Sequence, residues 1–136
     1  MWVESSISNE KLIKREYSDI LKTVKCFIKM ESMIKNNWIS KIKKIADKKK
    51  IAVWGAGSKG MTFVNMFDSN KKYIDCVIDI NVKKNKHFIP GTGHLIINPQ
   101  EIKSRKIDDI IIMNPNYKNE ILNTINKMNI KIDLIE

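Results

Sequence analysis

The chain has 136 residues, of which 43% are hydrophobic, and a formal net charge of +10. A chain of this length forms one domain whose core needs no disulfide or metal, and the hydrophobic content excludes a disordered protein. We do not expect a nucleic-acid partner from the charge alone, because every basic residue except Arg15 and Arg105 is lysine, whereas arginine is the usual reader of bases.

The first third of the sequence predicts a long helix. Between Glu10 and Asp47 there is no glycine or proline, and apolar residues recur at steps of three or four. Ser8 is a candidate N-cap, and Asn36-Asn37 is the point at which the helix could break in two. The apolar seam either packs on the following domain or pairs with the same helix of a second chain, although Glu31 interrupts its heptad pattern.

From residue 49 onward the pattern changes to an alternation of strands and helices. Apolar runs predict strands at 51–54, 73–80, 94–97, 108–113 and 130–135. Helices are predicted at 58–68 and 116–129, a helical turn begins at Pro99, and 81–93 is interpreted as a loop. We therefore expect a Rossmann-like three-layer α/β domain over residues 49–136, with four or five mostly parallel strands, preceded by a helical segment over 1–48.

The cysteines and the lack of long apolar runs bear on the compartment. Cys26 and Cys76 lie far apart without metal-binding spacing, which is typical of a reducing cytoplasm, and both are interpreted as small core residues. No apolar run reaches the length of about 18 residues that indicates a membrane span, and the N-terminus has no signal-peptide pattern. We expect a cytoplasmic protein without a membrane partner.

The strongest motif is the glycine-rich turn Gly55-Ala56-Gly57-Ser58-Lys59-Gly60, which follows a predicted strand and opens a predicted helix. In a Rossmann-type turn the first glycine permits the bend, the second lets the backbone approach a phosphate, and the third allows close packing of helix and strand. Lys59 is either a phosphate partner or a surface lysine. Asp79 ends the next strand, where an acidic side chain meets a ribose hydroxyl. The alternative is a tight corner that binds no ligand.

No group of residues in the sequence predicts a complete active site. There is no Gly-x-Ser-x-Gly, no His-Glu-x-x-His and no zinc-binding cysteine pair. His94 could transfer a proton, but neither it nor His87 has an obvious partner, and both are interpreted as loop histidines. We therefore expect a nucleotide-binding domain that is not an autonomous enzyme.

Four short motifs follow one another along the second part of the chain. They are the strand and turn at 51–60, the segment 77–81 with Asn81 and the following Lys84, the loop Pro90-Gly91-Thr92, and the segment 110–121 with Asn116-Tyr117. In this order they resemble the C-terminal domain of bacterial S-adenosylmethionine-dependent sugar C-methyltransferases. The sequence departs from the family pattern at Lys84-Asn85-Lys86, where Lys-x-Gly is expected, and at Pro115, where tryptophan is usual.

The resemblance implies that the domain holds a nucleotide-linked deoxysugar while another domain, which binds S-adenosylmethionine, supplies the methyl group. It adds Asn81, Lys84, the loop Pro90-Gly91-Thr92 and Asn116-Tyr117 to the candidate ligand-binding residues. The sequence has no methyl-donor motif, so we expect either an excised domain or a subunit of a split enzyme. Two alternatives remain: a redox or sensor module that binds NAD rather than NADP, because Asp79 repels a 2′-phosphate, and a ligand-free protein that dimerises through the N-terminal helix.

Overall fold

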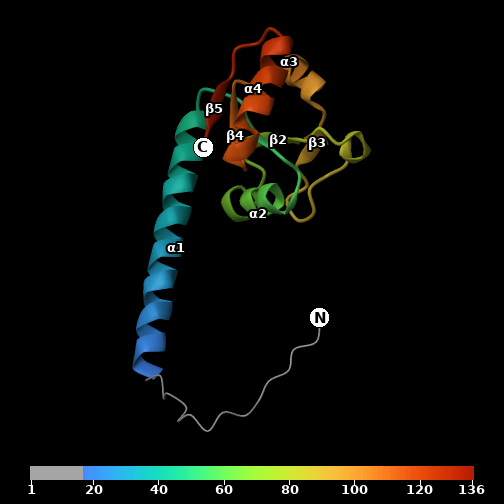
Figure 1. The fold of residues 1–136 in the computed structure, drawn as a ribbon. Helices are drawn as coiled ribbons and strands as arrows, with labels where there is room; N and C mark the ends of the chain where they lie inside the picture. The colour runs from blue at the N-terminus through green and yellow to red at the C-terminus, as the bar shows by residue number, and fades with distance from the viewer. Residues whose placement is uncertain (1–16) are drawn as a thin grey trace, which may run out of the picture. The chain divides into compact units, whose positions relative to one another are not determined.

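The computed structural model describes the backbone of residues 17–136 and the side chains from residue 19 onward. The chain separates into two compact units, Met1–Met33 and Ile34–Glu136. Helix α1 (Tyr17–Ala46) contributes to both units, and all other elements belong to the second (Figure 1). The predicted N-cap Ser8 and the predicted helical residues 10–16 lie outside the described residues. The helix continues without a break through Asn36-Asn37, the point at which it could have divided in two.

A parallel sheet forms the centre of the second unit. Its five strands are β1 (Ile51–Trp54), β2 (Ile74–Ile78), β3 (Leu95–Ile97), β4 (Asp109–Ile112) and β5 (Asp133–Ile135). They lie in the order β3-β2-β1-β4-β5, and every neighbouring pair is parallel. The predicted Rossmann-like α/β fold is therefore confirmed. The strand order grows outward from β1 in both directions, so the direction of winding reverses between β1 and β4.

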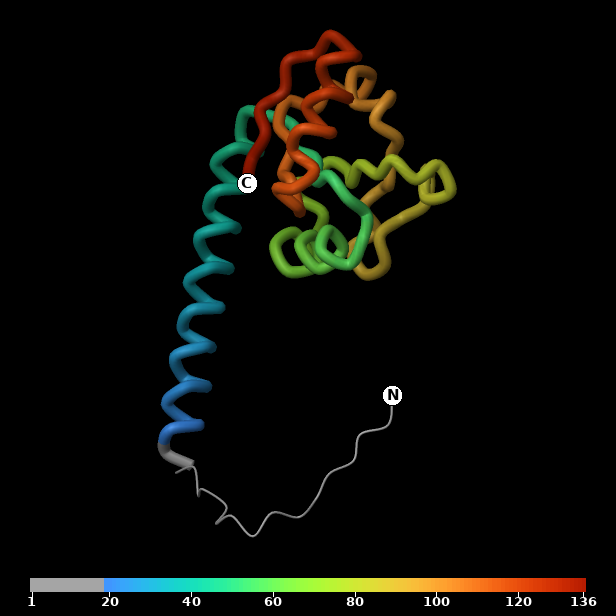
Figure 2. Tube along the Cα trace, viewed as in Figure 1, coloured from blue at the N-terminus to red at the C-terminus, as the bar shows by residue number. Residues whose placement is uncertain are grey.

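Helices cover both faces of this sheet. The helical elements after α1 are α2 (Ser58–Phe67), η1 (Val82–Lys84), η2 (Pro99–Glu101), α3 (Ile102–Arg105), η3 (Pro115–Tyr117) and α4 (Lys118–Lys127). One core joins α2 and the last turns of α1 to the sheet, and a second core joins α3 and α4 to the other face. In the chain trace, the green α2 and the orange-red α4 lie on opposite sides of the strands (Figure 2).

Alternation along the strands explains the two cores. In β1, Ile51 and Val53 face the core that contains α2, whereas Ala52 faces the core that contains α4. All four residues of β4 are buried, as expected for a central parallel strand. Cys76 is buried in the α4 core, as predicted, but Cys26 is exposed on α1, so the prediction of a core position was wrong for Cys26.

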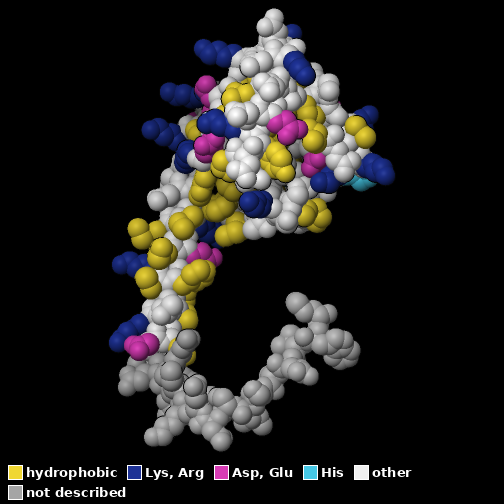
Figure 3. All heavy atoms as spheres, viewed as in Figure 1, with side chains coloured by type: hydrophobic (Ala, Val, Ile, Leu, Met, Phe, Trp, Pro, Cys, Tyr) yellow, Lys and Arg dark blue, Asp and Glu magenta, His cyan; other side chains and the backbone are white. Residues whose placement is uncertain are grey.

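Helix α1 has a different environment in each unit. From Trp38 onward it packs on the domain: Ile42 is fully buried, and the Trp38 and Phe63 ring centroids are 5.1 Å apart. Before Trp38 its large apolar side chains are exposed, and the space-filling view shows such side chains along the helix (Figure 3). They are Ile20, Leu21, Val24, Phe27, Ile28, Met30, Met33 and Ile34. Within the described part of the chain, no helix is both long enough and apolar enough to span a membrane.

Candidate nucleotide-binding site

The turn between β1 and α2 has the geometry that its glycines predict. Gly55 has a backbone φ of +113°, a value that residues with a side chain rarely adopt, so the bend requires glycine. A Cβ at Gly60 would collide with the carbonyl oxygen of Gly55, so the close packing of helix and strand also requires glycine. A Cβ at Gly57 would meet no atom within 4 Å. The Gly57 backbone therefore faces open space, which is what its predicted role beside a phosphate needs.

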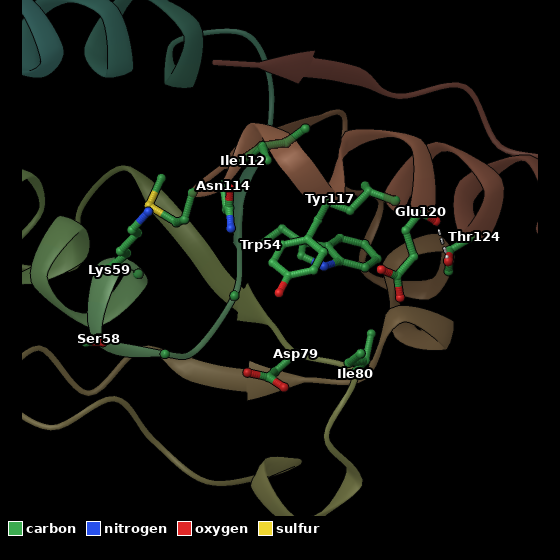
Figure 4. A pocket seen from close by; sticks show the side chains of 15 residues that line it. Trp54, Ser58, Lys59, Asp79, Ile80, Ile112, Asn114, Tyr117, Glu120 and Thr124 are labelled. Atoms are coloured by element: carbon green, nitrogen blue, oxygen red, sulfur yellow. Dashed lines mark hydrogen bonds between the residues drawn. The ribbon is translucent and has the colours of Figure 1, made fainter.

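A cavity of about 450 Å³ opens beside this turn, at the carboxyl ends of β1, β2 and β4 (Figure 4). This volume is within the range of small-molecule sites. The lining residues are Trp54, Gly55, Gly57, Ser58, Lys59, Gly60, Asp79, Ile80, Ile112, Met113, Asn114, Tyr117, Glu120, Ile121 and Thr124. The cavity lies where the strand order reverses, which is the usual place for a ligand in an open parallel sheet.

Polar groups lie at two separate ends of the cavity. Ser58 and Lys59 belong to the first turn of α2, whereas Glu120 and Thr124 belong to α4 (Figure 4). The N-cap of α2 is Gly57, so no capping side chain occupies the first N–H groups of this helix. The α2 end therefore favours an anion, and the α4 end offers a carboxylate to a hydrogen-bond donor.

Asp79 is held by three donors from the protein itself. Its Oδ2 accepts a hydrogen bond from the Ala56 N–H at 2.9 Å and lies 3.0 Å from Lys84 Nζ, while its Oδ1 accepts from the Asn81 N–H at 2.8 Å. Burial raises the pKa of Asp79, but the hydrogen bonds from Asn81, Lys84 and Ala56 outweigh it and hold the pKa below its ordinary value. The carboxylate is therefore ionised and largely occupied as a structural acceptor.

The cavity brings together seven of the residues that the sequence singles out. They are Gly55, Gly57, Ser58, Lys59, Gly60, Asp79 and Tyr117. Ala56, Asn81 and Lys84 do not line the cavity and instead bind Asp79. Asn116 is exposed on η3, where its N–H donates to the Asn114 side chain at 3.2 Å.

The loop Pro90-Gly91-Thr92 does not line the cavity. The Pro90 carbonyl accepts a hydrogen bond from Asn65, in the second half of α2, at 3.1 Å. Lys71, which precedes β2, donates to the Gly93 carbonyl at 3.0 Å. Both partners lie toward the amino ends of the strands, so this loop sits at the opposite edge of the sheet from the glycine turn. In this arrangement the loop is separate from the cavity, although the resemblance implied that it binds the ligand.

His94 lies in the loop just before β3, as interpreted, but it is buried and has partners that the sequence did not indicate. Its side chain is fully buried, with Nε2 3.2 Å from Asp68 Oδ2 and Nδ1 2.7 Å from Thr92 Oγ1. Asp68 also accepts hydrogen bonds from the N–H groups of Lys72, Tyr73 and Ile74. The partners Asp68 and His94 are 26 residues apart, and no spacing rule in the sequence signals this pair.

Several lining residues were not singled out from the sequence as site residues. They are Trp54, Ile80, Ile112, Met113, Asn114, Glu120, Ile121 and Thr124. Most lie at the carboxyl end of a strand or in the helix that follows β4, so the rule that ligands bind at those ends could have identified them. Among residues 17–136, no three His, Cys, Asp or Glu side chains are grouped as a metal site would require.

Together, the parallel sheet, the glycine turn and the adjoining cavity define an α/β domain of Rossmann-like fold. The chain belongs to the C-methyltransferase C-terminal domain family, whose model matches residues 3–131. This match confirms the resemblance found in the sequence. A comparison with curated proteins gives no match.

Three solved structures with a similar fold are all of RSP, a Rex-family repressor. The structure of RSP itself has 16% identity and a TM-score of 0.48 over 67% of this chain and 55% of that chain. The complex with beta-NAD+ and operator DNA has 21% identity and a TM-score of 0.47, over 67% and 48%. The complex with beta-NADH has 16% identity and a TM-score of 0.47, over 71% and 58%. The match thus spans about half of those chains, and similarity at this level carries no information about the ligand here.

Proposed function

We propose that this domain binds a nucleotide-linked sugar and presents it to a separate catalytic domain that carries S-adenosylmethionine. The observation that supports the proposal most directly is the cavity beside the Gly55–Gly60 turn, in a chain that belongs to a C-methyltransferase family. In this proposal the chain contributes recognition of the substrate, and methyl transfer takes place on the partner domain.

The distribution of groups in the cavity supports one orientation of the nucleotide. The diphosphate would lie against the N–H groups at the start of α2, with Lys59 as an additional positive charge. Trp54 and Tyr117 offer aromatic faces for stacking of the base. Glu120 would accept a hydrogen bond from an N–H or O–H group at the other end of the ligand.

The geometry of Asp79 weighs against the ribose contact that is expected at an NAD site. A carboxylate has about four acceptor positions, and protein donors already take three of those on Asp79. A ribose diol held by two hydrogen bonds, as expected for the acidic residue of a dinucleotide site, would need two free positions. NAD therefore remains the alternative ligand, and it belongs in the same binding experiment.

A thermal-shift screen tests the proposal. The ligands are the sugar conjugates of dTDP, UDP, GDP and CDP, together with NAD, NADP and S-adenosylmethionine. A ligand at about 100 times its Kd stabilises the fold by roughly 2.7 kcal/mol, which is a readable shift for a domain of this size. We expect a response to one sugar nucleotide, weakened in Lys59→Ala but not in Lys103→Ala, which removes an exposed lysine outside the cavity.

The outcomes of the screen separate the candidate functions. A response to NAD without a response to sugar nucleotides would favour the redox or sensor function. No response to any ligand would contradict nucleotide binding and leave the protein-binding role of α1.

The exposed apolar face of α1 supports a second candidate function, association with another copy of the chain. Seven large apolar side chains between Ile20 and Met33 are exposed on this helix. Contiguous apolar surfaces of this kind usually mark interaction sites. We expect a dimer by size-exclusion chromatography with light scattering, and Val24→Glu should shift it to monomer while Lys25→Glu, one residue along, should not. A wild-type monomer would contradict this function.

A further inference from the structure

Asp79 is a carboxylate in the wall of a cavity whose neighbouring residues are arranged to attract an anion. It follows β2 directly and lines the cavity together with Gly57, Ser58 and Lys59. Since Asp79 is ionised, its negative charge opposes that of a diphosphate bound at the start of α2. The site therefore needs a positive charge that cancels Asp79 without occupying the cavity.

Lys84 is in a position to do this. Its Nζ lies 3.0 Å from Asp79 Oδ2, and the two side chains are 38% and 11% exposed. Lys84 is not among the residues that line the cavity, so its ammonium group reaches Asp79 from outside the ligand volume. A pair with one largely buried partner is screened less by salt than an exposed pair, so the compensation persists at physiological ionic strength.

Asp79 and Lys84 also bind the two backbone polar groups of Ala56, one at its N–H and the other at its carbonyl. The Ala56 N–H donates to Asp79 Oδ2 at 2.9 Å, and the Ala56 carbonyl accepts a hydrogen bond from Lys84 Nζ at 3.1 Å. Ala56 is the residue between Gly55 and Gly57, and it is itself buried. Fixing its backbone orients the turn, and the next residues, Gly57, Ser58 and Lys59, line the cavity with no capping side chain on the first N–H groups of α2.

We propose that Lys84 is a positioning residue for the diphosphate: it cancels the charge of Asp79 and fixes the Ala56 carbonyl, so that the glycine turn presents donors to the ligand. This inference rests on the proposed function. It also assigns Asp79 to the turn instead of to a ribose of the ligand. Lys84 acts through Asp79 and Ala56 and does not touch the diphosphate.

The affinities for charged and uncharged ligands distinguish the proposed role of Lys84 from a purely structural one. If Lys84 only stabilised the turn, its removal would weaken binding of charged and uncharged ligands alike. If it compensates Asp79, removal weakens the diphosphate and leaves the corresponding nucleoside nearly unchanged. Lys84→Gln suits this comparison because its amide can still donate a hydrogen bond but carries no charge.

The experiment is isothermal titration calorimetry with dTDP, UDP, GDP and CDP and with the four matching nucleosides. The diphosphate that wild type binds is then titrated into Lys84→Gln, Lys84→Arg and Asp79→Asn/Lys84→Gln. Lys83→Gln is the matched control, because Lys83 is an exposed neighbour that makes no ion pair among the described residues. Circular dichroism confirms that each variant is folded.

We expect Lys84→Gln to weaken the diphosphate about tenfold and the nucleoside less than about twofold. Lys84→Arg and the double variant should restore most of the diphosphate affinity, the first by keeping the charge and the second by removing the charge that it cancels. Equal diphosphate affinity in Lys84→Gln and wild type would overturn the inference, and so would equal loss of both ligands without recovery in the double variant.

Two further results complete the design. If Lys84→Gln does not fold, the diphosphate affinity of Asp79→Asn tests the inference instead. Retained affinity supports the inference. A loss greater than about tenfold contradicts it, because such a loss indicates a direct contact between Asp79 and the ligand. If wild type binds none of the four diphosphates, the proposed function fails first and this inference fails with it. Binding by wild type with no effect of Lys84→Gln would remove only the inference.

Discussion

The two edges of the sheet each contain an aspartate that accepts several hydrogen bonds, and the contrast between them explains where the site lies. At the carboxyl edge, Asp79 binds the glycine turn and Lys84 and remains part of a cavity wall. At the amino edge, Asp68 is 3% exposed and binds His94 and three consecutive backbone N–H groups. One edge is left open to a ligand, and the other is closed.

The direction of α2 accounts for this difference. The helix begins at the carboxyl edge after Gly57, where its first N–H groups have no capping side chain. It ends at the amino edge with Asp68, whose N–H donates back to the Val64 carbonyl at 2.9 Å. The positive end of the helix dipole thus lies beside the cavity, where it favours an anionic ligand. In our proposal Lys84 offsets the charge of Asp79, which would otherwise repel that ligand.

The largest expected effect comes from removing the aspartate at the closed edge. Asp68→Ala leaves His94 and three N–H groups without their acceptor in the interior, and we expect it to lower the free energy of unfolding by about 3 kcal/mol. Urea denaturation followed by circular dichroism measures the loss. Asp79→Ala is the matched control and should cost about 1 kcal/mol, because Asn81 is exposed and Lys84 is partly exposed, so that two of its three donors can bind water instead. Equal losses would remove the distinction between the edges.

An intermediate effect is expected within the glycine turn itself. Gly60→Ala places a Cβ against the Gly55 carbonyl, and overpacking of this kind should lower stability by about 2 kcal/mol. The control is Gly57→Ala, whose Cβ meets nothing and whose φ of −93° suits any residue, so stability should change by less than about 0.5 kcal/mol. Chemical denaturation of both variants tests the prediction, and a Gly57→Ala as unstable as Gly60→Ala would contradict it.

The smallest expected effect concerns acid sensitivity at the open edge. The pKa of Asp79 is lower in the folded protein than in the unfolded chain, so its contribution to stability is present above the unfolded value and is lost as pH falls through the folded one. The stability difference between wild type and Asp79→Asn should therefore shrink below about pH 4. Urea midpoints at pH 7 and pH 3 measure it. A difference that grows at pH 3 would show that the pKa shift has the opposite sign.

Much of the architecture could be predicted from local patterns. The strand at 51–54 was predicted with the bounds that it has, because a run of buried apolar residues ends there in glycine. The run of isoleucines before Met113 identified β4, and all four of its residues are buried. The strand at 73–80 was predicted too long, since β2 ends at Ile78 and the chain then turns, with the Asp79 side chain accepting a hydrogen bond from the Asn81 N–H.

The sequence by itself determined the alternation of elements and the glycine turn, because both depend on conformational preferences of neighbouring residues. Only the tertiary structure decided that Lys84 binds Asp79, that His94 is buried against Asp68, and that Pro90-Gly91-Thr92 lies at the edge away from the cavity. It also decided which residues of α4, such as Glu120, face the cavity. These features depend on which strand ends meet across the sheet, and that pairing brings together residues that are distant in sequence.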